Sequence, residues 1–153
     1  MQDEELYKPP NATLGNSELD IHGLYSPGQI GVAAFIGGPI AGSWLLASNF
    51  ASLGKRDAKT KTVIAGIVLT ACVIALSLYL PDDFPALVFP FVYTVVFFQL
   101  AGKLQGYDVR QFIDDGGKRF SHWRVLGISV VSIVIFMLVV VALVLLVPAA
   151  FEG

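Results

Sequence analysis

Four long apolar segments, separated by shorter polar ones, dominate the pattern of the chain. They cover residues 29–53, 62–80, 84–102 and 125–147, and none has a charged residue in its interior. A helix rises about 1.5 Å per residue, so about 20 residues cross a hydrocarbon core of about 30 Å. Lipid offers the backbone no hydrogen bonds, and the alternating pattern of a barrel strand is absent. Each segment therefore predicts a membrane-spanning helix.

The connections between these segments are short enough to make neighbouring helices antiparallel. Residues 81–83 form a tight turn, Pro81-Asp82-Asp83, and residues 54–61 join the first two segments. The prediction is an all-α fold, a membrane-embedded antiparallel four-helix bundle spanning residues 28–148. A flexible acidic N-terminal tail, residues 1–27, precedes it, and a short C-terminal tail, residues 149–153, follows.

Positive charge predicts the orientation of the bundle. Nine of the ten Lys and Arg residues lie in the first and third connections, residues 54–61 and 103–124. An up-and-down chain places these two connections on the same side. Because cytoplasmic loops carry the excess of Lys and Arg, we expect both connections in the cytoplasm and both termini outside.

The composition supports a lipid environment and gives no support for a nucleic-acid partner or an intramolecular disulfide. The chain is 55% hydrophobic and 14% charged, with a net charge of −2. A quarter of the residues of a soluble domain are typically charged. The net charge gives no reason to expect a nucleic-acid partner. The single cysteine, Cys72, excludes an intramolecular disulfide.

The first apolar segment has small residues at helical spacing. Ala34, Gly38 and Gly42 recur every four positions, with Gly37 beside them and Pro39 predicted to kink the helix. Such a stripe favours close helix packing, as in a GxxxG pair. The alternative is a hinge or a ligand site at a broken helix.

Polar residues within the segments are few, and none is ionisable. Asn49, Tyr93 and Gln99 carry the polar groups of most interest. Asn49 and Gln99 are expected either to form an interhelical amide contact or, with Tyr93, to line a neutral polar pathway. Proton relays and ion-coupled pumps need an ionisable group at membrane depth. No catalytic set, metal site or cofactor is expected.

The third connection, residues 103–124, has two interpretations: a helix lying on the membrane surface or a solvated loop. Lys118 and Arg119 are candidate contacts for anionic lipid. Tyr25, Trp123 and Arg124 are candidate anchors at the membrane interface.

The spacing of several of these residues resembles a known pattern. Residues 24–30 read LYSP-x-QI, residues 35–42 read F-x-GGP-x-AG, and Leu45-Leu46, Asn49 and residues 53–55 (LGK) follow. This signature resembles that of small uncharacterised multipass bacterial inner-membrane proteins. The resemblance implies a bacterial inner-membrane location and a single domain, and it assigns no catalytic residue.

Three functions fit this sequence. The leading hypothesis is a non-enzymatic membrane protein that acts by helix–helix association, as a homo-oligomer or as an accessory or immunity-type subunit of another membrane protein. The first alternative is a small oligomeric transporter or channel. The second is a lipid sensor at the membrane surface.

Overall fold

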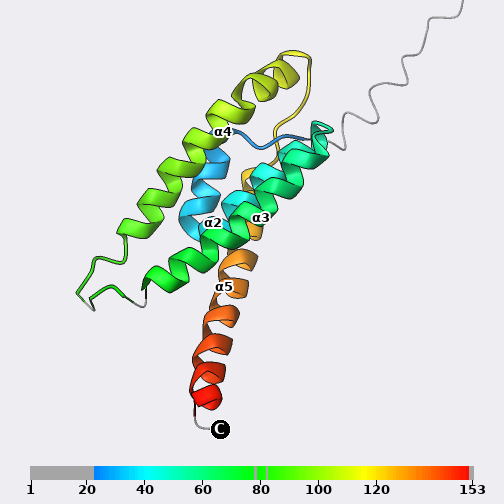
Figure 1. Ribbon diagram of the computed structural model, residues 1–153. Coiled ribbons are helices and arrows are strands. Elements are labelled where there is room, and N and C mark those ends of the chain that lie inside the picture. Colours follow the sequence, from blue (N-terminus) through cyan, green and yellow to red (C-terminus); the bar gives the residue numbers. More distant parts are fainter. Residues whose placement is uncertain (1–22, 78, 82, 152–153) are drawn as a thin grey trace, which may run out of the picture.

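The computed structural model describes residues 23–77, 79–81 and 83–151, and this part of the chain is all-α, as predicted. Its four helices are α2 (Pro27–Ser52), α3 (Arg56–Ser77), α4 (Val88–Asp114) and α5 (His122–Phe151) (Figure 1). Residues 1–22 of the predicted acidic tail and residues 152–153 lie outside the described residues. All four helices are long and apolar enough to cross a membrane, which indicates a multipass membrane protein.

Helix α2 does not run straight; it folds back on itself. The side chain of Asn49 hydrogen-bonds to both the backbone nitrogen and the backbone oxygen of Tyr25, each at 2.8 Å. In a straight helix, residues 24 positions apart would be separated by about 36 Å. The two arms, residues 27–37 and 39–52, therefore form a helical hairpin with its tip at Gly38 (Figure 1).

Backbone geometry at the tip explains the reversal. Gly38 has φ 67° and ψ −163°, values outside the helical region, and Pro39 follows it directly. A positive φ suits glycine because a side chain would clash there. Proline has no N–H to continue the helical ladder. The helix therefore breaks completely at Gly38, one residue before the kink that was predicted at Pro39.

The hairpin is the centre of the molecule, and the other three helices surround it. α3, α4 and α5 each pack against α2, whereas they make almost no contact with one another. The four helices are compatible with the predicted bundle, and α2 lies at its centre. Small residues on several sides of α2 let three helices approach it at once.

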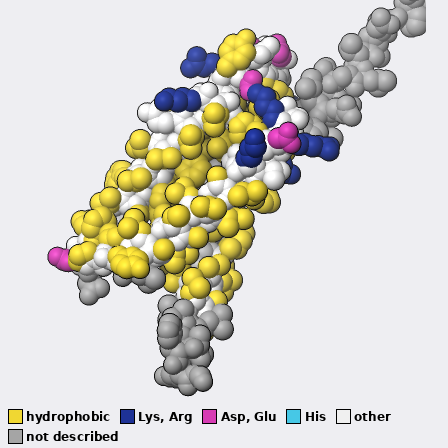
Figure 2. Space-filling view, in the orientation of Figure 1, with side chains coloured by type: hydrophobic (Ala, Val, Ile, Leu, Met, Phe, Trp, Pro, Cys, Tyr) yellow, Lys and Arg dark blue, Asp and Glu magenta, His cyan; other side chains and the backbone are white. Residues whose placement is uncertain are grey.

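The folded α2 also changes the order in which the chain alternates between the two ends of the molecule. Residues 23–26, the turn after α2 and the connection of residues 115–121 all lie at one end, called here the basic end (Figure 1). α3 leads away from this end, α4 returns to it, and α5 leads away again. Lys and Arg side chains gather there, above a largely hydrophobic surface (Figure 2). The described part of the chain therefore enters and leaves α2 at the basic end.

The third connection is shorter than predicted. α4 continues through Asp114, so residues 103–114 all extend the helix, and residues 115–121 alone join it to α5. Neither a separate surface helix nor a long solvated loop is present in residues 103–124. Lys103, Asp108, Arg110 and Asp114 therefore stand on α4, whereas Lys118 and Arg119 lie on the connection.

Candidate functional site

A cavity of about 660 Å³ lies beneath the tip of the hairpin, on the side away from the basic end. The hairpin tip contributes residues 35–39, and the three outer helices form the walls. The wall residues are Val73, Ile74 and Ser77 of α3, Phe89, Pro90 and Tyr93 of α4, and Ile133, Phe136, Val140 and Leu143 of α5. Known ligand pockets measure about 300–1,000 Å³, so the cavity is large enough for a small ligand.

The cavity exists because the hairpin is shorter than the helices around it. Its arms of 11 and 14 residues rise about 16 and 21 Å, whereas the 22 residues of α3 rise about 33 Å. Beyond the tip, no part of the described chain fills the space between the outer helices. A methyl group added at Gly38 would meet nothing within 4 Å, so the tip faces open space.

The lining of the cavity is apolar apart from two hydroxyl side chains and the backbone of the tip. The hydroxyl of Ser77 donates to the carbonyl of Ile74 in its own helix at 2.7 Å, which leaves the phenol of Tyr93 as the main polar side chain. The break at Gly38 also ends one arm and begins the next, and helix ends leave backbone groups without partners in their own helix. No lining residue carries a charge. The cavity therefore suits an apolar ligand, and among its lining residues the phenol of Tyr93 is the one polar side-chain group that is not bonded within its own helix.

Metal binding has no support in the described residues. No group of three or more His, Cys, Asp or Glu side chains lies close enough there to hold an ion.

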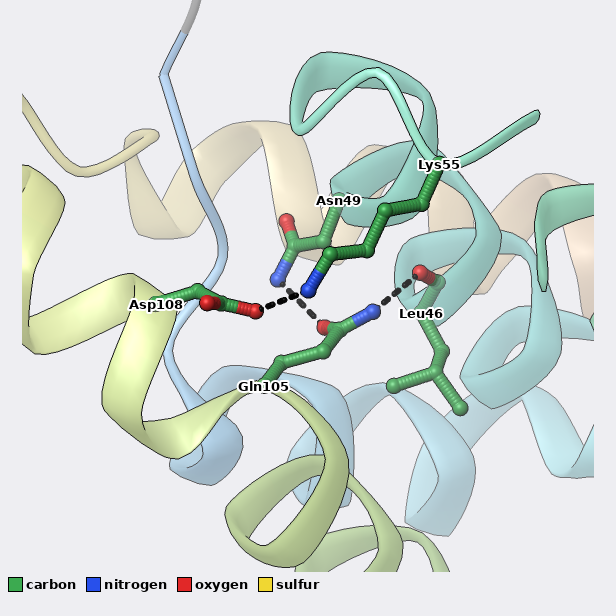
Figure 3. Close-up of polar contacts among 5 residues, drawn as sticks. All are labelled: Leu46, Asn49, Lys55, Gln105 and Asp108. Carbon is green, nitrogen blue, oxygen red and sulfur yellow. Dashed lines mark hydrogen bonds and ion pairs between the residues drawn. The ribbon is translucent and has the colours of Figure 1, made fainter.

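The two arms are held together at the basic end by a buried amide network (Figure 3). Asn49, whose side chain is hydrogen-bonded to the backbone of Tyr25, also donates to the side-chain oxygen of Gln105 in α4 at 3.0 Å. Gln105 in turn donates to the carbonyl of Leu46 at 2.9 Å. Asn49 and Gln105 are each 1% exposed, and among the described residues no buried side-chain polar atom lacks a partner. The network therefore fixes the hairpin to α4.

A second set of contacts fixes the first arm to the start of α5. Ser26 and Gln29 form a capping box, in which each side chain accepts a hydrogen bond from the backbone N–H of the other. The side-chain nitrogen of Gln29 donates to the carbonyl of Phe120 at 2.8 Å. It also lies 3.5 Å from Nδ1 of His122.

The structure separates the three residues predicted to share a polar contact or pathway. Asn49 is buried in the amide network, Tyr93 lines the cavity, and Gln99 is exposed on the outer side of α4. The predicted pairing of Asn49 with Gln99 is wrong, because Gln105 faces Asn49 instead. Within one chain, Gln99 thus lies apart from both Asn49 and Tyr93.

The small residues of α2 pack inside the molecule. A methyl group added at Gly42 would lie 2.8 Å from the ring of Phe97 in α4 and 3.0 Å from the side chain of Ala34 on the other arm. One added at Gly37 would lie 2.8 Å from the carbonyl oxygen of Ser129 in α5. Gly37 and Gly42 of the stripe thus pack within one chain, whereas Gly38 faces open space at the tip.

The predicted interface anchors fall into two groups. Trp123 is 80% exposed at the basic end, as an anchor should be. Tyr25 is buried, with its ring 4.6 Å from that of Phe120, and Arg124 lies 4.1 Å above the same Phe120 ring. Burial raises the pKa of the Tyr25 phenol, and the positive charge of Arg124 opposes part of that increase. Tyr25 is therefore part of the packed interior and not a lipid-facing anchor.

Lys118 and Arg119, the predicted contacts for anionic lipid, are exposed on the connection before α5. This connection runs beside the start of α2. The backbone N–H of Leu24 donates to the carbonyl of Lys118 at 3.3 Å, and the N–H of Phe120 donates to the carbonyl of Leu24 at 3.2 Å.

Gln29 and Gln105, which bond the hairpin to the start of α5 and to α4, are the side chains whose roles the sequence prediction missed. Gln105 lies three residues beyond the predicted end of the third segment and was assigned to a connection. Gln29 opens the first segment, and its spacing of three from Ser26 is the one sequence signal for its capping role.

No protein-family model, curated protein or solved structure matches the chain.

Proposed function

We propose that this protein is a bacterial inner-membrane protein that binds an apolar ligand in the cavity beneath its hairpin, and that it carries out no chemistry there. The observation that carries this proposal is the cavity, an uncharged and almost wholly apolar space at the tip of a broken helix. Non-helical backbone at membrane depth is tolerated where it lies within protein or lines a cavity. A lipid acyl chain is the commonest apolar group at this depth.

The proposal includes a specific membrane arrangement. α3, α4 and α5 each cross the bilayer, whereas α2 is a re-entrant hairpin, since arms that rise about 16 and 21 Å do not span a core of about 30 Å. The basic connections lie in the cytoplasm. The start of α2 then lies in the cytoplasm as well, and the end of α5 lies outside. The bacterial location rests on the sequence resemblance described above.

Ligand retention tests the function. We would purify the protein in a mild detergent and measure bound lipid by native mass spectrometry. Val140 lines the cavity and its neighbour Val139 does not, so Val140→Trp should sharply reduce the retained lipid while Val139→Trp should not. Equal retention by the two variants would overturn the proposal.

Thiol labelling tests the membrane arrangement separately. In a Cys72→Ser background, cysteines at Gly28, Asp57 and Asp83 would be challenged in intact cells with an impermeant reagent. The re-entrant arrangement protects Gly28→Cys and Asp57→Cys and exposes Asp83→Cys. Labelling of Gly28→Cys together with Asp83→Cys would mean that α2 crosses the membrane.

Association with another membrane protein is the second candidate. Large apolar side chains are exposed along α3, α4 and α5, including Ile67, Phe91 and Leu138. In this arrangement the outer helices would contact the partner. Recovery of a second chain in the same mass spectrum, in place of lipid, would favour this function.

A further inference from the structure

A second groove runs between the first arm of α2 and α5, and it begins at the basic end. Its volume is about 450 Å³. Ile36 lines both this groove and the cavity beneath the tip. The two spaces are therefore adjacent, with Ile36 between them.

The end of the groove nearest the basic end is polar. Ser26, Gln29, His122 and Trp123 line it. Trp123 is largely exposed, and tryptophan is favoured at the level of lipid headgroups. The connection of residues 115–121 runs beside this end, because its backbone is hydrogen-bonded to Leu24, just before the first arm. It carries two cations, Lys118 and Arg119, against one carboxylate, Asp115.

The deeper part of the groove is apolar. Val32, Ile36, Val125 and Leu126 line it. The first arm rises about 16 Å from its start to the tip, and the tails of one leaflet fill about half of a core of about 30 Å. A lipid tail that enters beside Trp123 thus reaches the level of Ile36 and the cavity.

We infer that the ligand is an anionic phospholipid of the leaflet next to the basic connections. This inference rests on the proposed function and adds the class of ligand. The phosphate headgroup lies between Trp123, His122 and the cationic connection, and one acyl chain follows the groove to Ile36. Charge complementarity selects the headgroup, and the continuous apolar lining accepts the tail.

Competition between two lipids tests the inference. The protein would be equilibrated in vesicles of equal parts phosphatidylglycerol and phosphatidylcholine, extracted, and analysed by native mass spectrometry. We expect retained phosphatidylglycerol to exceed phosphatidylcholine. The double variant Lys118→Gln/Arg119→Gln should reduce this preference roughly tenfold, since each cation near the surface contributes measurably to binding anionic lipid.

The matched control removes the same charge from the same end of the molecule. Lys59→Gln/Lys61→Gln changes two exposed cations at the start of α3, away from the groove, and should leave the preference unchanged. An equal loss in both double variants would show a general surface effect and overturn the inference. All four substitutions are at exposed positions, so the variants should fold.

The outcomes separate this inference from the proposed function. Equal retention of the two lipids by the unaltered protein, with retention still blocked by Val140→Trp, would overturn the anionic ligand and keep the cavity function. Retention of neither lipid would overturn both. Ile36→Trp, which closes the junction between the two spaces, should lower retention of the phospholipid, and unchanged retention would contradict the path of the tail.

Discussion

The half of the molecule at the basic end, called here the closed half, is packed around the hairpin apart from the groove beside α5, whereas the half beyond the hairpin tip is open. At the basic end, the hairpin fills the space between the outer helices, and two amide networks tie its arms to α4 and α5. Beyond the hairpin tip, the same three helices line a partly open cavity. Polar side chains thus hold the hairpin in place in one half, and the proposed ligand would occupy the apolar other half.

The largest expected effect comes from breaking the packing of the closed half. Gly37→Leu places a side chain against the backbone of Ser129 in α5, and we expect it to lower the free energy of unfolding by about 3 kcal/mol. Gly127 in α5 has open space around it, so Gly127→Leu is the control. Denaturant unfolding in detergent, followed by circular dichroism, measures both. Similar losses would mean that the contact between the hairpin and α5 is unimportant.

Removing the amide network should have a smaller effect on the same half. Asn49→Leu leaves the backbone groups of Tyr25 and the amide of Gln105 without their partner, and we expect a loss of about 2 kcal/mol. Gln99→Leu, at an exposed position of α4, should change stability by less than about 0.5 kcal/mol. The same unfolding assay applies. A loss in Gln99→Leu equal to that in Asn49→Leu would restore the original pairing of Asn49 with Gln99.

The boundary between the two halves is the break at Gly38. Gly38→Ala should cost about 1 kcal/mol, because a side chain disfavours its positive φ even though the space around it is open. Gly38→Asn should cost at least as much, since ψ −163° lies outside the left-handed helical region that asparagine tolerates. Gly102→Ala, within α4 and also in open space, should instead stabilise the protein slightly. A stabilising Gly38→Ala would argue for a continuous helix.

The smallest effect is expected at the outer edge of the closed half. Lys55 and Asp108 form an ion pair at 2.6 Å, with side chains 47% and 27% exposed. Exposed pairs contribute about 0.2–1 kcal/mol, and salt weakens them. Asp108→Asn should therefore lower stability by no more than this, and the difference from the unaltered protein should shrink in high salt. A loss that persists in high salt would show a packing role.

The sequence predicted four helices but not the path of the first. Residues 29–53 contain enough apolar residues to cross a membrane, so length alone favours a crossing. The reversal depends on contacts of Gly37 and Gly42 with α5 and α4, and on a hydrogen bond from Asn49 to Gln105, 56 positions along the chain. The one local signal was Gly37-Gly38-Pro39 at the middle of the segment. These residues predict a break in the helix, but they do not predict the angle between the two arms.

The cavity could not have been predicted either. The cavity arises because the hairpin arms are shorter than the outer helices. This difference in length cannot be known before α2 is known to fold back. Pro39 and Tyr93 were identified as residues of interest, and both do line the cavity. Gln99 was grouped with them because a buried amide was expected, yet its side of α4 faces outward.

The central position of α2 has a consequence for the assembly of the protein during synthesis. The N-terminal part of a chain is made first, but 67% of the apolar part of α2 is buried beneath helices made later. Neither arm is long enough to cross the bilayer, and the backbone at the tip is unsuited to bare lipid. In the proposed re-entrant arrangement, the hairpin therefore completes its packing only after Gln105 and Ser129, which lie on later helices, have been synthesised.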